Sequence, residues 1–376
     1  MKILFVVPRY HTNMIGWVKA FVNAGDEVLI NTMRQGYTES YDIVKPVVFK
    51  ESLVATFLTK IFGNGGPNAP RSFPNIFTYF WYLRKEKPDV IIVRDITRWF
   101  SFLAAIYARG LGIKVVIYSQ MPLYSKYSVK RKRTIDFINI FFGSFWMTPI
   151  KGNGKNAANL PNKVVYIPFV ADVVEAAAMI KVNEPVSILM IGKFVDRKNH
   201  LELIKVLHDL KVLGYVFHLK VVGENSTPGH NEKLKEIRRY IVNNELENEV
   251  TILQNIPNEH MSDLYAESDL FILPASKEPA SISVIEAMGY GIPVICADEC
   301  GTSCYITDNL NGYIFKENDF VGLKICIEKY LNEKDKNAMR LNCRNEAQRL
   351  ISSENFLNIF KQIANCDDRN NGHPVR

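Results

Sequence analysis

Ser276–Ile295 reads SKEPASISVIEAMGYGIPVI; the apolar run Asp269–Pro274 precedes it, and a second, Ile292–Ala297, overlaps its end. Short apolar runs bounded by turn residues are typical of buried parallel strands, and the segment between them has the composition of a helix. A strand–loop–helix–strand unit is therefore expected. Open α/β sheets bind ligands beyond the carboxyl ends of their strands, where Glu278 would lie before the helix and Glu286 within it.

The start of this expected helix suits an anion. Ser281 or Ser283 is placed to act as the N-cap, and the free N–H groups of the first helical turn favour a phosphate. Glu278 and Glu286 would then address different parts of one long ligand. The ordinary alternative is an acidic loop followed by a solvated helix residue, because most charged side chains are simply exposed.

Length and composition favour a two-domain globular protein. The chain has 376 residues, more than one hydrophobic core usually supports, with 47% hydrophobic and 23% charged residues. Met1–Val7 resembles a first buried strand more than a cleavable segment, and the apolar run Phe137–Ile150 is too short to span a bilayer. The six cysteines form no CxxC pair, which predicts free thiols in a reducing cytoplasm.

Charge divides the chain into unlike halves. Residues 1–170 hold 23 Lys and Arg against 9 Asp and Glu, a balance of +14, and the remainder holds 23 against 30, or −7. Of the 43 aromatic residues, 29 lie before residue 171. A basic, aromatic half beside an acidic half indicates different partners for each, and an anionic membrane, a phosphorylated lipid or nucleic acid would suit the first.

Strands and helices alternate through both halves, which predicts two doubly wound domains that face one another. The expected strands are Lys2–Val7, Glu27–Asn31, Asp89–Val93, Lys114–Tyr118, Ser187–Gly192, Phe217–Val222 and Val250–Leu253. The expected helices lie near Ile15–Asn23, Arg98–Arg109, Leu201–Leu213, Lys233–Asn243, Glu259–Glu267 and Glu354–Ala364. These elements predict domains over residues 1–170 and 186–352, a hinge at 171–185, and a C-terminal helix and tail over 353–376.

Three short patterns in the second half point toward the same cleft. Lys193 and Lys198 follow the strand Ser187–Gly192, where cations would bind a diphosphate. Gly223 ends the strand Phe217–Val222 and permits close approach of backbone to a ligand. Residues 255–265, NIPNEHMSDLY, would wall a nucleobase pocket. Each pattern alone is nonspecific, but their order and spacing, together with the two glutamates, are specific.

This ordered set resembles the retaining glycosyltransferases of family 4, which have the GT-B fold. The resemblance rests on IGKFVDRKNH, VVGE, the pattern MxxLYAxSDLFILP, the two glutamates separated by seven residues, and EAMGYGIPVI, and it covers residues 185–320. It implies a C-terminal domain that holds a nucleotide-sugar donor. The N-terminal half resembles the family only in its general pattern.

The resemblance also assigns roles to individual residues. Lys198 and Lys193 would neutralise the diphosphate, Glu286 would bind the ribose hydroxyls, and Glu278 would contact the donor sugar near the bond that breaks. Backbone amides would meet the sugar and phosphates at Ala280, Ser281, Ile282 and Ser283. No DxD motif occurs, so the expected reaction needs no metal and no cofactor beyond the nucleotide-sugar co-substrate.

The chain departs from the family pattern at a few positions. Lys193 stands where arginine is usual, and Ser281 stands where glycine is frequent. Gln120 follows the strand Lys114–Tyr118 where many members carry a histidine; it can donate a hydrogen bond but cannot act as a base. Gly16 alone represents the glycine-rich first loop, and it is the candidate there for approaching the donor phosphates.

Candidate acceptor residues lie after the N-terminal strands: His11, Arg94 and Asp95. A histidine in an ordinary role and an Arg–Asp surface pair are the alternatives. The basic cluster Lys130–Arg133 precedes the aromatic stretch Phe137–Trp146. Together they favour docking on an anionic membrane about as much as they favour a solvated face.

The sequence thus predicts a retaining hexosyltransferase that moves a sugar from a nucleotide donor to a glycan or lipid-linked acceptor, in O-antigen, capsule or lipopolysaccharide synthesis. We expect it in the cytoplasm, with peripheral association at the inner face of the membrane. A nucleotide-sugar epimerase of the same fold, or a non-catalytic binder of sugar or nucleic acid, remains an alternative. No nucleic-acid motif accompanies the basic charge, so nucleic acid is not expected as a partner.

Overall fold

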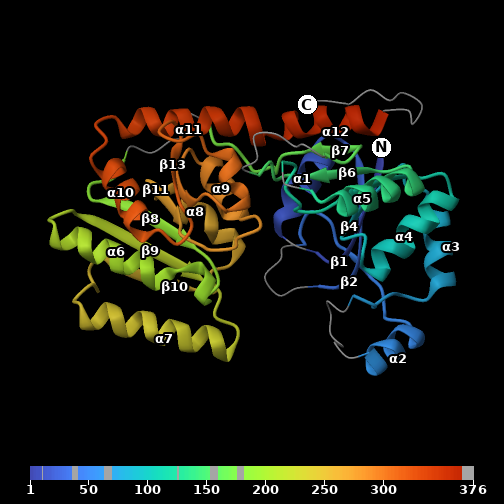
Figure 1. Ribbon diagram of the computed structural model, residues 1–376, viewed down its shortest axis with the longest axis horizontal. Coiled ribbons are helices and arrows are strands. Elements are labelled where there is room, and N and C mark those ends of the chain that lie inside the picture. Colours follow the sequence, from blue (N-terminus) through green and yellow to red (C-terminus); the bar gives the residue numbers. More distant parts are fainter. Residues whose placement is uncertain are drawn as a thin grey trace. The chain divides into compact units, whose positions relative to one another are not determined.

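A computed structural model of the chain describes residues 1–10, 12–35, 41–62, 70–124, 127–152, 160–175 and 182–365. The chain forms two compact units, whose elements are labelled in Figure 1. The first unit is Met1–Val170 together with the segment that starts at Ser353, and the second is Ala171–Ser352. Residues 176–181 of the predicted hinge lie outside the described residues.

The first unit is built on a parallel sheet. Its described strands run in the order β3-β2-β1-β4-β5-β6-β7, so the chain starts in the middle, proceeds to one edge and crosses back to β4. The strands are β1 (Lys2–Arg9), β2 (Glu27–Arg34), β3 (Val47–Val48), β4 (Val90–Arg94), β5 (Lys114–Tyr118), β6 (Phe145–Thr148) and β7 (Val164–Tyr166). The reversal between β1 and β4 is the place where such sheets bind ligands.

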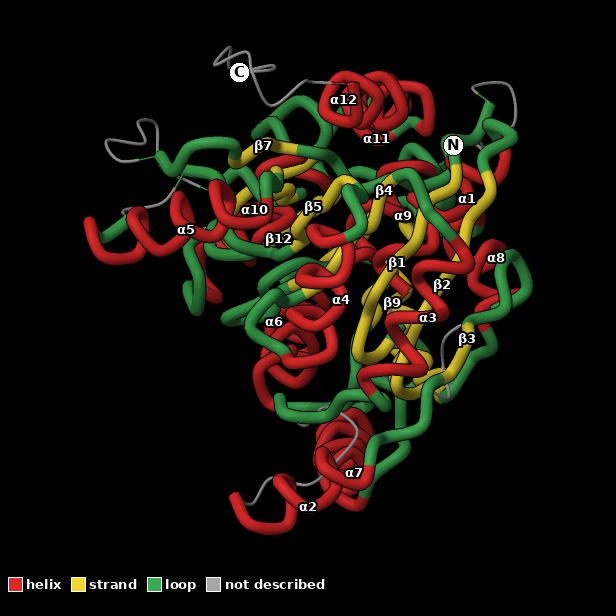
Figure 2. Tube along the Cα trace, turned by 90° about the vertical axis from the view of Figure 1, so that its right-hand side faces the viewer, coloured by secondary structure: helices red, strands yellow, loops and turns green. Residues whose placement is uncertain are grey.

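Helices flank this sheet, as Figure 2 shows in red around the yellow strands. They are α1 (Ile15–Asn23), α2 (Leu53–Phe62), α3 (Ile76–Glu86), α4 (Trp99–Gly110), α5 (Val129–Phe142) and α12 (Ser353–Asn365). The C-terminal helix α12 packs on α1, because the Phe21 ring meets Phe356 at 5.0 Å and Phe360 at 4.8 Å between centroids. The expected return of the C-terminal helix to the N-terminal domain is confirmed.

The second unit repeats the same winding. Its described strands run in the order β10-β9-β8-β11-β12-β13, with every pair parallel. They are β8 (Val186–Ile191), β9 (Phe217–Gly223), β10 (Val250–Gln254), β11 (Leu270–Leu273), β12 (Val294–Ala297) and β13 (Gly312–Phe315). The helices are α6 (His200–Val212), α7 (Pro228–Asn243), α8 (Met261–Ala266), α9 (Ile282–Gly289), α10 (Phe320–Leu331) and α11 (Lys336–Ile351). The predicted fold class, with two Rossmann-like domains, is confirmed.

Two predicted segments differ in detail. The aromatic stretch Phe137–Trp146 is not one element: Gly143, at φ 60°, ends α5 in the left-handed conformation that glycine adopts readily, and the chain then enters β6. Phe145 and Trp146 are consequently buried in the sheet. The helix expected at Glu259–Glu267 begins instead with a 3₁₀ turn, which α8 follows.

None of the described helices is long and apolar enough to cross a membrane. The five cysteines in the described part of the chain are free thiols.

Gly16 is required by packing inside the first unit. A Cβ atom at this position would lie 1.9 Å from the carbonyl oxygen of Val170, a backbone atom that cannot rotate away. We expect Gly16→Ala to destabilise the protein by at least about 1–3 kcal/mol, the usual cost of overpacking. Urea unfolding measures this, with Gly110→Ala as the control, because no neighbouring atom lies within 4 Å of a Cβ at Gly110. Equal stability of the two variants would contradict the packing role.

Candidate functional site

The predicted donor residues gather where the second sheet reverses its winding. β8 and β11 are neighbours at this reversal. Lys193 and Lys198 follow the carboxyl end of β8, and Glu278 follows that of β11. Because carboxyl ends of adjacent parallel strands meet at one edge, residues 80 positions apart are brought together.

Glu278 lies at the centre of this group and binds two cations. Its Oε2 atom accepts from Lys198 Nζ at 2.7 Å and from Arg197 Nη1 at 2.5 Å. Glu278 and Lys198 are 6% and 7% exposed, whereas Arg197 is half exposed at 46% of its side chain. Glu278 and Lys198 were each predicted as site residues, but their contact was not, and Arg197 was missed although it stands in the same run, VDRKN.

Lys198 reaches Glu278 because Gly192 leaves room for its stem. A Cβ at Gly192 would meet Lys198 Cδ at 3.0 Å. His200 also packs at this point, with Nε2 3.3 Å from the Gly192 carbonyl oxygen and its ring 5.2 Å from that of Phe194. Since a carbonyl only accepts, Nε2 carries a proton and donates to the Gly192 oxygen.

Burial lowers the pKa of His200 to about 4, from the ordinary value of 6.5. Between these values the unfolded chain binds a proton that the folded chain does not, so the free energy of unfolding falls as pH drops from 6.5 to 4. We expect His200 to account for about 3 kcal/mol of this loss. Urea unfolding at pH 7 and near pH 4 measures it, and His200→Gln should show a correspondingly smaller pH dependence. An unchanged dependence in the variant would contradict this assignment.

Lys193 has a separate partner. Its Nζ lies 2.7 Å from Glu224 Oε2, at the end of β9. Burial alone would raise the pKa of Glu224, but hydrogen bonds from Lys193 and Ser226 outweigh it, so the net shift is downward. Gly223, which precedes Glu224, is fixed by packing, because a Cβ there would lie 2.5 Å from the Phe194 ring.

The first turn of α9 is free of a side-chain cap. Ser281 is the N-cap residue, as one of the two predicted alternatives, but its hydroxyl does not cap the helix. Instead its Oγ pairs with Ser283 Oγ at 2.8 Å, and both side chains are buried. The backbone N–H groups that follow Ala280, at the start of α9 (Ile282), thus have no side-chain cap. Such free N–H groups are suited to bind an anion.

Glu286 lies on α9 and is held by Tyr265 of α8. The Tyr265 hydroxyl donates to Glu286 Oε2 at 2.6 Å. Burial raises the pKa of Glu286, and the bond from Tyr265 opposes that shift without cancelling it. Tyr265 itself stands in the quoted pattern LYA, yet its partnership with Glu286 was not anticipated.

A second polar group occurs in the first unit, at the end of β5. The buried Tyr118 hydroxyl accepts from Asn13 Nδ2 at 3.1 Å and from Gln120 Nε2 at 3.5 Å. The Arg94 guanidinium lies 5.6 Å from the Tyr118 ring. Burial raises the pKa of Tyr118 to about 12, so the phenol stays protonated. Gln120 and Arg94, both predicted, are thereby brought together, and Asn13 was missed.

Two buried polar atoms of this group make no hydrogen bond within the described chain, Arg94 Nη1 and Asn13 Oδ1. Arg94 forms a loose ion pair with Asp95, 3.6 Å from Nε to Oδ2. The third candidate for the acceptor side, His11, lies outside the described residues.

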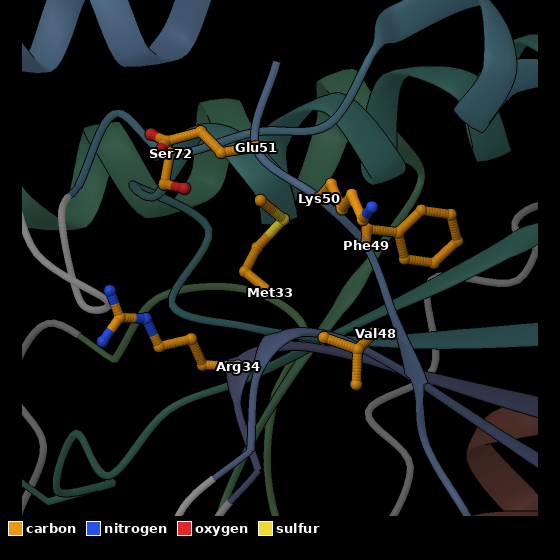
Figure 3. Close-up of a pocket in the computed structure, with 7 residues that line it drawn as sticks. All are labelled: Met33, Arg34, Val48, Phe49, Lys50, Glu51 and Ser72. Atoms are coloured by element: carbon orange, nitrogen blue, oxygen red, sulfur yellow. The ribbon is translucent and has the colours of Figure 1, made fainter. Parts of the chain in front are cut away.

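A hollow of about 300 Å³ lies elsewhere in the first unit, beside the ends of β2 and β3. Figure 3 shows Met33 pointing into it, with Arg34 and Lys50 on opposite sides of Met33 in this view. Its lining does not include Arg94, Asp95 or Gln120. Among the described residues, no group of three His, Cys, Asp or Glu side chains is arranged to hold a metal ion.

The family model described as glycosyl transferases group 1 matches residues 157–350, just over half of the chain. The chain belongs to this family. The match contains the predicted donor residues of the second unit, from Lys193 to Glu286.

Several curated relatives are similar to part of this chain. The amylovoran biosynthesis glycosyltransferase AmsK of Erwinia amylovora is 24% identical over 36% of this chain and 34% of its own. An Escherichia coli UDP-Gal:alpha-D-GlcNAc-diphosphoundecaprenol alpha-1,3-galactosyltransferase is 27% identical over 30% and 27%. Protein CapJ of Staphylococcus aureus is 28% identical over 49% and 47%. The matches thus span from about a quarter to about half of these relatives.

Solved structures match the chain over nearly its whole length. A glycosyltransferase from Rickettsia africae gives a TM-score of 0.72 at 16% identity, covering 97% of this chain and 99% of the other. Anabaena Alr3699/HepE in complex with UDP-glucose gives 0.69 at 16%, covering 97% and 100%. These similarities show the fold, which is GT-B.

Proposed function

We propose that the chain transfers a hexose from a nucleotide-sugar to a glycan or lipid-linked acceptor, with retention of anomeric configuration, as a family 4-like enzyme. The E. coli relative is named for transfer to a sugar on diphosphoundecaprenol, and the Anabaena structure holds UDP-glucose. Relatives named for amylovoran and colanic acid biosynthesis support a role in surface polysaccharide synthesis. We infer action in the cytoplasm, at the inner face of the membrane.

The cluster of Glu278, Lys198 and Arg197 carries this proposal. Loss of the sugar from a nucleoside diphosphate develops negative charge on the leaving phosphate, and fixed cations stabilise that charge most when they need not reorganise. Glu278 holds the Lys198 ammonium in place at 2.7 Å, and the uncapped turn of α9 adds backbone N–H groups. We propose that these groups bind the diphosphate without a metal ion.

The two glutamates would divide the rest of the donor between them. Both side-chain hydrogen bonds of Glu278 within the described chain use Oε2, so Oε1 can accept a hydroxyl of the donor sugar. Glu286 is oriented by Tyr265 and would accept the ribose hydroxyls. Lys193, already paired with Glu224, would add positive charge near the phosphates.

The first unit would supply the acceptor side. We propose that Gln120, Arg94 and Asp95 contact the acceptor or the transferred sugar, that His11 contributes to the acceptor side, and that the backbone at Gly16 approaches the donor phosphates. The unpartnered Arg94 Nη1 and Asn13 Oδ1 are groups that a sugar hydroxyl would satisfy. Residues 171–185 would serve as the hinge between the two domains.

The test is incubation of purified protein with a nucleotide-sugar, with and without a lipid-linked glycan acceptor. Mass spectrometry should show the acceptor enlarged by one hexose, and NMR should show a new linkage with the anomeric configuration of the donor. Isomerisation of the donor sugar without acceptor would replace this proposal with an epimerase. Donor binding without any turnover would indicate a non-catalytic sugar-binding protein.

A further inference from the structure

Helix α2 turns its large apolar side chains away from the protein. Leu53, Phe57 and Ile61 recur every four residues, which places them on one face, and they are 89%, 63% and 57% exposed. The buried residues of the helix are the small Ala55 and the polar Thr59. A surface helix normally shows the reverse arrangement, with its apolar stripe facing the core. This outward stripe needs a partner.

A chain of contacts within the first unit links α2 to α4. Phe62, at the end of α2, lies under the Arg71 guanidinium at 4.5 Å. The neighbouring Pro70 carbonyl accepts from the Trp99 amide at 2.9 Å, and Trp99 stacks on Phe73 at 5.6 Å. Helices α2, α3 and α4 lie along the right-hand side of the view in Figure 1 and toward the viewer in Figure 2.

From α4 the same surface reaches α5. Phe102 meets Phe142 edge-on at 5.9 Å, Phe142 meets Phe141 at 4.9 Å, and Phe141 stacks on Phe137 at 6.0 Å. Phe102, Phe137 and Phe141 are all exposed. The exposed apolar residues of these three helices make up a strip, joined through the half-buried Arg71 and the buried Phe73 and Phe142. They are more numerous than isolated apolar residues on an ordinary surface.

The strip is strongly basic. Helices α2, α4 and α5 carry six Lys and Arg residues against one acid, Asp136. Asp136 is already paired with Lys132 at 2.7 Å. On α5, Lys130 and Arg133 share the exposed face with Phe137 because the three are three and four residues apart.

We propose that the outward faces of α2, α4 and α5 form a docking surface for an anionic lipid bilayer. Aromatic and aliphatic side chains would enter the boundary between headgroups and acyl chains, while lysines and arginines contact lipid phosphates. A second copy of the chain fits less well, because its own copy of this surface would bring like charges together. The inference does not depend on sugar transfer, since bilayer binding needs no donor.

The experiment is co-sedimentation of the full chain with vesicles of phosphatidylcholine alone and of phosphatidylcholine mixed with phosphatidylglycerol. Wild type should bind the mixed vesicles, and binding should weaken as salt rises. The double variant Phe57→Glu with Ile61→Glu should bind at least about tenfold more weakly, because two large apolar side chains no longer partition. Lys130→Gln with Arg133→Gln should weaken binding to mixed vesicles only.

The matched control is Val212→Glu with Val216→Glu, two exposed valines of the second unit. The thermal midpoint of each variant establishes that it is folded, and size-exclusion chromatography reports oligomeric state. Failure of wild type to bind mixed vesicles, equal binding to neutral vesicles, or a Phe57/Ile61 variant that binds like the control would each overturn the proposal. A Phe57/Ile61 variant that only dissociates a dimer would assign the surface to self-association instead.

Discussion

Replacing Lys198 by methionine is expected to lower the rate of sugar transfer by about 100- to 1,000-fold, the usual effect of removing one preorganised group that stabilises developing charge. Lys198 is buried beside Glu278, and its ammonium is fixed at 2.7 Å from that carboxylate. Methionine keeps the length and apolar stem that pack over Gly192. Initial rates at saturating donor measure the effect, because it should appear mainly in kcat.

Lys205→Met is the control, because it also removes one positive charge but at a residue outside the proposed site. Lys205 lies on α6, pairs with Glu202 at 2.9 Å and is half exposed. Arg197 still pairs with Glu278 when Lys198 is lost, so the thermal midpoint should show that Lys198→Met is folded. A Lys198→Met enzyme as active as Lys205→Met would remove Lys198 from the proposed chemistry.

The second large effect concerns stability. Arg340 of α11 and Asp269, just before β11, form a buried ion pair of 3.0 Å, with the residues 3% and 0% exposed. Asp269 also accepts the Ser187 amide at 2.8 Å, which ties it to β8. We expect Arg340→Met to cost about 3–5 kcal/mol, because it leaves a buried carboxylate without its cation.

Urea unfolding of the whole chain measures this cost. Arg349→Met is the matched control on the same helix, since Arg349 is 64% exposed and pairs with Glu346 at the surface. Such exposed pairs contribute about 0–1 kcal/mol. A loss for Arg340→Met no larger than for Arg349→Met would show that the Asp269 carboxylate is satisfied without the arginine.

Much of the fold was predictable because buried parallel strands leave apolar runs in the sequence. Lys114–Tyr118 and Ile15–Asn23 were predicted at their observed bounds, and most of the other elements that were predicted differ from the observed ones by one or two residues. Helix α2 was not predicted. Its large apolar side chains point outward, and the residues that it buries are Ala55 and Thr59, so its apolar stripe does not mark a face packed on the core. The strand β6 was hidden in an aromatic run that Gly143 divides.

The site was predictable in its members and not in its contacts. The order of Lys198, Glu278 and Glu286 along the chain carried the resemblance, and the structure brings Lys198 to Glu278. Arg197 and Tyr265 were missed as partners because a pairing across 81 or 21 residues depends on where loops meet, which local patterns do not encode. The predicted roles of these residues toward a donor remain predictions.

The central claim is that the second unit holds a nucleotide-sugar through Glu286. Thermal unfolding with a panel of UDP-, GDP- and other nucleotide-sugars tests it most directly, since a ligand at 100 times its Kd stabilises the folded state by about 2.7 kcal/mol. At least one nucleotide-sugar should raise the midpoint of wild type, and Glu286→Gln should lose most of that increase. The claim would be contradicted if no nucleotide-sugar shifted the wild-type midpoint, or if Glu286→Gln were stabilised equally.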